Sequence, residues 1–148
     1  HFEPTQSGQS HIATDKEDGV EIKNLVLDQY CGTNQIDRVD FAKIDLEGHE
    51  LSALKGWGNC LRNHIVKSIY IEIMPENQRR YCLKTNDPLM FLESHGYKLF
   101  LCKEQDFGYF GQRPFFKNTG LDEVKLSFFK AEEYPADFST DVLALAPN

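Results

Sequence analysis

The sequence predicts an α/β domain with a mainly parallel sheet flanked by helices. Short apolar segments typical of strands, at residues 39–45, 65–73 and 97–102, alternate with segments of helical periodicity at 50–61 and 87–95. Strands that are separated by helices favour parallel pairing, because a parallel connection needs a long crossover. We therefore expect the 148 residues to form one domain, with helices on both faces of the sheet.

Composition and charge exclude several classes of protein. The formal net charge is −7 and the charges are interspersed, so there is no basic patch to bind nucleic acid. No stretch reaches the roughly 18 apolar residues of a membrane span, and no signal-peptide pattern is present at the start. The four cysteines lack the spacing of zinc sites. We expect a cytoplasmic protein with reduced thiols and neither nucleic-acid nor membrane partners.

The N-terminal part is predicted to be less regular than the rest. Residues 1–19 are polar and lack periodicity, so we expect a flexible lead-in. Residues 20–23 alternate weakly, as an edge strand does. Asp28 follows an apolar run and is expected to cap a short helix that ends at Gly32. Because the first residue is His1 and not methionine, we expect the sequence to be a piece of a longer chain.

One stretch, residues 39–57, organises the chain. Its first part alternates apolar and polar side chains, and after Gly48 the period becomes helical, so Gly48 marks a tight turn from strand to helix. In an open α/β sheet, such a turn lies at the carboxyl end of a strand, where ligands bind. This turn concentrates four ionisable residues, which indicates a site: Asp45, Glu47, His49 and Glu50.

The later elements follow from apolar runs and helix boundaries. Residues 65–73 are almost continuously apolar, which is typical of a central strand covered on both faces. Pro75 ends this strand, and Arg79 and Arg80 are expected in a short surface helix. The helix at 87–95 begins at Asp87-Pro88 and ends at Gly96. The remaining expectations are an ordered aromatic loop at 105–119 and further strands at 125–130 and 141–146.

The segment Lys43-Ile44-Asp45-Leu46-Glu47-Gly48-His49-Glu50-Leu51, with Leu54-Lys55-Gly56 behind it, resembles the signature of FkbM-type S-adenosylmethionine-dependent methyltransferases. The resemblance extends to Gly8-Gln9-Ser10, Val26-Leu27-Asp28, Ile71-Glu72 and, more loosely, residues 141–147. It implies part of a class I, Rossmann-like methyltransferase fold and S-adenosylmethionine as cofactor. It also implies O-methylation of a hydroxyl group on a small-molecule or carbohydrate acceptor.

The resemblance implies roles for individual residues. Asp45 would end the fourth strand and face the transferred methyl group, and Asp45 and Glu47 are the cofactor-binding candidates. The catalytic candidates are Asp45, Glu47, His49 and Glu72, because an alcohol needs a carboxylate or imidazole base within about 3 Å. Glu72 in an apolar strand is costly to bury without a site role or a partner such as Lys43. Structural roles stay open for all four, and Glu50 is expected to complement the helix dipole.

The sequence departs from the family upstream of Val39. The glycine-rich loop and the acidic strand end that hold the cofactor in class I enzymes are missing there. Three strand–helix units would need on the order of 90 residues, and only 38 precede Val39. The chain is therefore expected to be the carboxyl-terminal half of a methyltransferase, without the N-terminal cofactor-binding strands.

Two other functions stay open. A metal-dependent hydrolase is one, since Asp45, Glu47 and His49 offer carboxylate oxygens and an imidazole for a divalent metal. The other is a non-catalytic remnant of a methyltransferase. Loss of the first strands would expose a sheet edge and an apolar face, which favours a homo-oligomer if the chain is complete.

Overall fold

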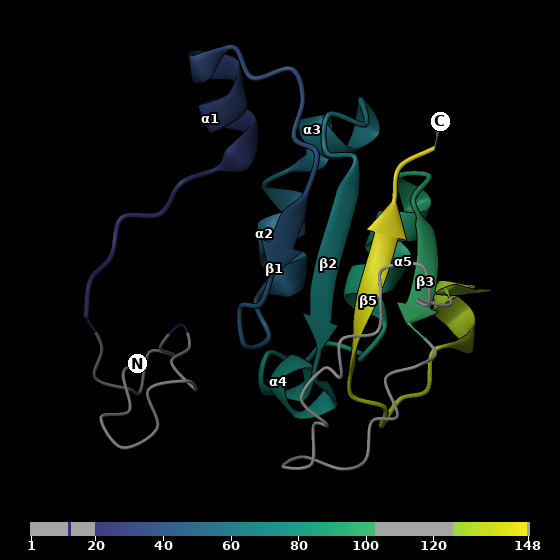
Figure 1. Ribbon diagram of the computed structural model, residues 1–148. Coiled ribbons are helices and arrows are strands. Elements are labelled where there is room, and N and C mark those ends of the chain that lie inside the picture. The colour runs from purple at the N-terminus through teal and green to yellow at the C-terminus, as the bar shows by residue number, and fades with distance from the viewer. Residues whose placement is uncertain (1–11, 13–19, 103–125, 148) are drawn as a thin grey trace, which may run out of the picture.

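The computed structural model describes residue 12, residues 20–102 and residues 126–147 (Figure 1). The expected aromatic loop at 105–119 and, apart from residue 12, the expected lead-in at 1–19 lie outside this described part. The elements are, in order, α1 Leu27–Asn34, β1 Ala42–Ile44, α2 Glu50–Lys55, α3 Gly58–Arg62, β2 Ser68–Ile73, α4 Pro75–Arg80, α5 Asp87–Ser94, β3 Lys98–Cys102, β4 Leu126–Phe129, the 3₁₀ helix η3 Ala131–Glu133 and β5 Thr140–Leu145.

The sheet is mixed, so the prediction of a mainly parallel sheet was wrong. The five strands have the order β1-β2-β5-β3-β4, and only β1 and β2 pair in parallel. The ladders β2–β5, β5–β3 and β3–β4 are antiparallel. The helical connections do give β1, β2 and β3 one direction, as expected. The difference arises because β5, the last strand of the chain, inserts between β2 and β3 and runs the opposite way.

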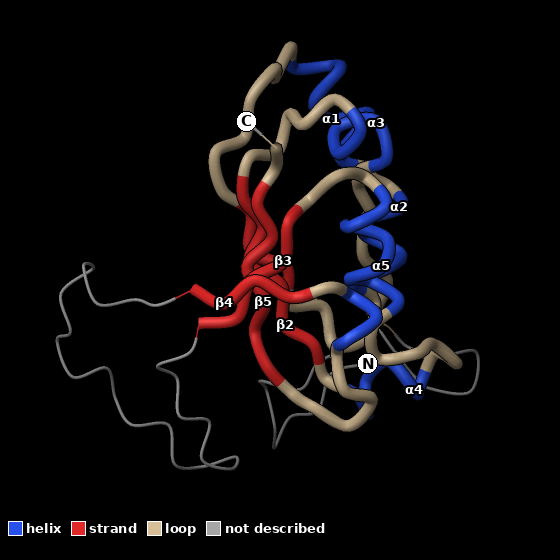
Figure 2. Tube along the Cα trace, turned by 90° about the vertical axis from the view of Figure 1, so that its right-hand side faces the viewer, coloured by secondary structure: helices blue, strands red, loops and turns tan. Residues whose placement is uncertain are grey.

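One face of the sheet carries the hydrophobic core. Along β2 the side chains of Ile69, Ile71 and Ile73 are fully buried, whereas Tyr70 and Glu72 between them point to the other face. Figure 2 shows the labelled helices together on one side of the sheet. In the part of the chain that the structure describes, the expected helices on both faces are therefore not seen. The buried core also includes Leu54, Leu61, Val66, Leu89, Leu92, Leu99, Val142 and Ala144.

Two of the predicted N-terminal elements differ in the structure. Residues 20–23 form no strand, and α1 continues through Gly32 instead of ending there. Asp28 is a helix cap, but of α3 and not of its own helix: its carboxylate accepts hydrogen bonds from the backbone N–H groups of Asn59 at 2.8 Å and Cys60 at 2.9 Å. Sequence position identified the capping residue and missed which helix it caps.

The predicted helix at 50–61 is divided into α2 and α3, with Gly56 and Trp57 between them. The short helix after Pro75, the helix at 87–94 and the strands β3, β4 and β5 agree with the predictions. β1 lies at one end of the sheet, and Phe41 just before it is 59% exposed. Among the described residues, no helix has the length and apolar character needed to cross a membrane.

Candidate active site

The turn between β1 and α2 is built around a buried carboxylate, that of Glu50. Glu50 is only 2% exposed. Its Oε1 atom accepts hydrogen bonds from the backbone N–H groups of Leu46 at 3.0 Å and Gly48 at 3.1 Å. Its Oε2 atom accepts a hydrogen bond from the Gln78 side chain at 2.5 Å. Glu50 does lie in the first turn of α2, but these bonds make it the anchor of the whole turn.

The same turn is joined to the start of α4 by a second contact. The side-chain amide of Asn77 donates a hydrogen bond to Glu47 Oε2 at 2.5 Å. Glu47 and Gly48 both have positive φ, 53° and 104°. A side chain at Gly48 would overlap the Asn77 carbonyl and lie 2.8 Å from the Tyr81 ring. Gly48 therefore makes room for α4, and the turn after β1 is held against this helix.

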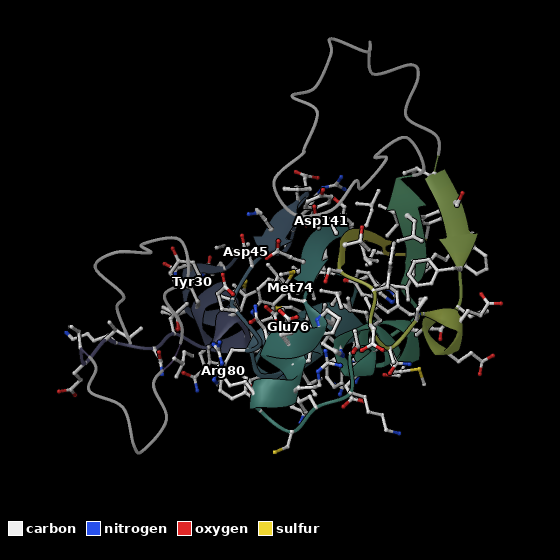
Figure 3. The ribbon with its side chains drawn as sticks, turned by 90° about the horizontal axis from the view of Figure 1, so that it is seen from below. Tyr30, Asp45, Met74, Glu76, Arg80 and Asp141 are labelled. Atoms are coloured by element: carbon white, nitrogen blue, oxygen red, sulfur yellow. The ribbon has the colours of Figure 1, made fainter. Side chains whose placement is uncertain are left out.

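A cluster of ionisable side chains lies beside this turn, on the face of the sheet opposite the helices. We call it the open-face cluster, and it consists of Asp45, Glu72, Asp141, Lys43 and Tyr70. Lys43 Nζ lies 2.6 Å from Asp45 Oδ2. Glu72 is opposite Asp141 in the β2–β5 ladder, and the Tyr70 hydroxyl donates a hydrogen bond to Asp141 at 2.9 Å. Figure 3, seen from below the sheet, shows Asp45 and Asp141 near each other.

The cluster perturbs one carboxyl group strongly. The pKa of Glu72 is raised from 4.5 to about 7, first by burial, then by the negative charge of Asp45 and a hydrogen bond with it, and further by Asp141 and Glu47. Lys43 experiences the opposite effect: its hydrogen bond and ion pair with Asp45 raise its pKa. A carboxyl group that titrates near neutral pH has the proton affinity expected of a general base.

The structure separates the predicted site residues into two groups. Asp45 and Glu72 come together in the open-face cluster. Glu47 instead bonds Asn77, and the half-buried His49 ring packs edge-on against Tyr81 with 4.2 Å between ring centroids. The three proposed metal ligands Asp45, Glu47 and His49 thus have different neighbours. Among the described residues, no group of three His, Cys, Asp or Glu side chains could hold a metal ion.

Sequence reasoning missed two groups in the cluster, Tyr70 and Asp141, and the amide partners Asn77 and Gln78. A signal for Asp141 was present, since it is the only charged residue in an otherwise apolar strand. That signal could be used only with the β2–β5 register, which places Asp141 opposite Glu72. The amide partners carry no comparable local pattern.

A mixed α/β sheet with carboxylates at the ends of two neighbouring parallel strands, one of them titrating near neutrality, is typical of an enzyme that acts on a small ligand. Residues 1–99 match the family model of the methyltransferase FkbM domain. This match covers most of the chain, so the protein belongs to the FkbM methyltransferase family.

A named relative is consistent with this family. The chain is 30% identical over 81 residues to the hexuronic acid methyltransferase AglP of Haloferax volcanii. The matched region covers 51% of this chain and 33% of that relative, so the similarity extends over about a third of the relative's length. No solved structure matches the chain significantly.

Proposed function

We propose that this chain carries the acceptor site and binds the methyl-bearing end of the cofactor in an S-adenosylmethionine-dependent O-methyltransferase, which methylates a hydroxyl group of a sugar or another small natural product. The observation that carries the proposal is the position of Glu72. It lies beside Asp45 at the carboxyl ends of two parallel strands, where open α/β sheets bind ligands. Membership of the FkbM family and the similarity to a hexuronic acid methyltransferase support the same chemistry.

The residues of the cluster suit one part of the cofactor that the family implies. S-adenosylmethionine supplies an electrophilic methyl group on a positively charged sulfur. Asp45 and Asp141 offer negative charge to a neighbouring cation, and so does Glu72 once it is ionised. Gly48 does not form a cradle for a ligand, because the space at its Cα is taken by Asn77 and Tyr81. The described residues therefore fit the cationic end of the cofactor.

Glu72 is the proposed general base. As the oxygen of an acceptor hydroxyl forms its bond to the methyl carbon, the bond between that carbon and sulfur would break and S-adenosylhomocysteine would leave. The hydroxyl must lose its proton in this step, and the ionised Glu72 carboxylate would accept it. Because the pKa of Glu72 is about 7, a substantial fraction is ionised at neutral pH and still binds a proton more strongly than an ordinary carboxylate. Asp45 contributes by keeping negative charge beside Glu72.

The test combines binding with methyl transfer by this 148-residue chain. Calorimetric titration with S-adenosylmethionine and S-adenosylhomocysteine should show binding. Transfer of a radiolabelled methyl group should then be measured with glucuronic acid and with glucose as acceptor probes. Glu72→Gln should lower the transfer rate by about 100-fold or more, because it removes the base, and it should leave S-adenosylhomocysteine binding in place.

Glu76→Gln is the matched control, since Glu76 is exposed on α4 and lies outside the cluster. It should transfer the methyl group at the rate of the unmodified chain. A chain that binds neither cofactor form and transfers no methyl group would contradict the proposed function. Binding and transfer that survive Glu72→Gln would contradict the role of Glu72 alone.

A further inference from the structure

Lys43 is the cation of the open-face cluster. Its Nζ atom lies 2.6 Å from Asp45 Oδ2. The two residues are two positions apart at the end of β1, so their side chains point to the same face of the sheet. The ammonium group is also attracted to Glu72 and Asp141. We infer that Lys43 is a positioning residue, whose ammonium group stays paired with Asp45 and offsets part of the negative charge beside Glu72, so that Glu72 ionises more easily. The inference rests on the proposed function for its catalytic meaning.

The strand register explains why each carboxylate has a different neighbour. Lys43 is opposite Tyr70 in the β1–β2 ladder, and Glu72 is opposite Asp141 in the β2–β5 ladder. Asp45 consequently has the lysine cation beside it, and Asp141 has the neutral hydroxyl of Tyr70. Glu72 lies between these two carboxylates and is hydrogen-bonded to Asp45.

A hydrogen bond between two carboxyl groups requires one of them to carry the proton. The group nearer a positive charge ionises first, because the cation stabilises its anion. In this pair the nearer group is Asp45, at 2.6 Å from the ammonium nitrogen of Lys43. Glu72 therefore ionises second, and it can act as the base of the proposed function once it has lost the shared proton.

Among the described residues, the charged groups that face Glu72 act on its ionisation in opposite directions. They are Lys43 from β1, Asp45 and Glu47 from the turn that follows it, and Asp141 on β5, and the Tyr70 hydroxyl on β2 lies beside them. The carboxylates among them oppose ionisation of Glu72, and the ammonium group favours it. Arg79 of α4 forms its own ion pair with Asp137 at 2.7 Å. Removal of Lys43 should therefore make Glu72 harder to ionise.

The experiment is an NMR titration of carbon-13-labelled carboxyl groups in the full chain, with no cofactor present. Lys43→Met should move the Glu72 titration to higher pH by roughly half a unit, the scale of a partly exposed ion pair. Asp45→Asn should move it to lower pH, because a neighbouring negative charge is lost. Lys43→Arg keeps the positive charge and should keep the titration in place.

Arg38→Met is the matched control. Arg38 and Asp40 form an exposed ion pair, also with an N–O distance of 2.6 Å and also two residues apart, but outside the cluster. Breaking it should leave the Glu72 titration unchanged. Lys43 is itself exposed, so its variants should keep the fold, which the amide NMR spectrum checks.

A Lys43→Met chain whose Glu72 midpoint stays in place or falls would overturn the inference. So would a Glu72→Gln chain that keeps the near-neutral titration, since the titration would then belong to another group. If only the proposed function is wrong, the outcome is different. The midpoint of the Glu72 titration then still shifts in Lys43→Met, but the chain transfers no methyl group. If the chain is active, the midpoint of its pH–rate profile should move with that of Glu72 in Lys43→Met.

Discussion

Glu50 and Glu72 both lie near the same edge of the sheet, but their partners give them opposite properties. Glu50 is almost fully buried and accepts hydrogen bonds from the N–H groups of Leu46, Gly48 and Gln78. Glu72 is half-buried and faces other carboxylates, and its pKa rises to about 7. N–H donors stabilise a carboxylate, whereas neighbouring carboxylates destabilise it. The comparison shows that the partners of a carboxylate, and not its burial alone, separate a structural anchor from a candidate base.

The largest effect should come from removal of the anchor. Glu50→Ala leaves two backbone N–H groups and the Gln78 amide without their acceptor inside the protein. It should lower the free energy of unfolding by about 3–5 kcal/mol, because several hydrogen bonds to a charged group are lost together. Urea denaturation of both chains measures the difference.

Glu132→Ala is the control for this loss, since Glu132 is exposed in η3. It should change the free energy of unfolding by about 0.5 kcal/mol or less. If Glu50→Ala is as stable as the control, the buried carboxylate is not an anchor, and the contrast between Glu50 and Glu72 disappears.

The second-largest effect should come from a substitution at Gly48, where the turn after β1 closely approaches α4. Gly48→Ala would place a methyl group against the Asn77 carbonyl and the Tyr81 ring, at a residue whose φ is 104°. It should destabilise the protein by about 2–4 kcal/mol, through backbone strain and overlap combined. Thermal unfolding followed by circular dichroism gives the change.

Gly32→Ala is the matched substitution. Gly32 lies within α1, and a methyl group added there would have no atom within 4 Å. It should stabilise the protein by about 0.5–1 kcal/mol, because alanine favours the helix more than glycine does. Equal effects of the two substitutions would mean that Gly48 is not required by the packing of α4.

The sequence was sufficient for most of the local elements. Periodicity located β1, β2 and α5, and the predicted turn at Gly48 does lie between β1 and α2, at the carboxyl end of β1. Asp45 and Glu72, both predicted as site residues, lie beside each other, and their role in a site stays a prediction. These predictions depend on neighbours along the chain.

The predictions that failed depend on contacts between distant segments. The direction of β5 next to β2 cannot be read from either strand, so the mixed sheet was missed. Glu50 is held in place partly by a hydrogen bond from Gln78, and Glu47 accepts a hydrogen bond from Asn77. Both partners come from α4, which is distant in the sequence. The ring of His49 packs against Tyr81, a contact that the sequence does not reveal, and its role as a base stays a prediction. The local sequence can therefore suggest candidate side chains, but their actual neighbours depend on the tertiary packing.

The smallest effect should appear in the pH dependence of stability. The pKa of Glu72 rises from 4.5 in a model peptide to about 7 in the folded chain. Between these values the folded chain binds a proton that the unfolded chain has released, so stability falls as the pH rises. Because Glu72 is only half-buried, solvent screening reduces the loss to about 1–2 kcal/mol.

Urea denaturation at about pH 5 and pH 8 should show this loss of stability in the unmodified chain and in the exposed control Glu76→Gln. The loss should be absent in Glu72→Gln. An equal pH dependence in all three chains would mean that Glu72 is an ordinary carboxylate like its neighbours on the surface, and the contrast with Glu50 would reduce to burial.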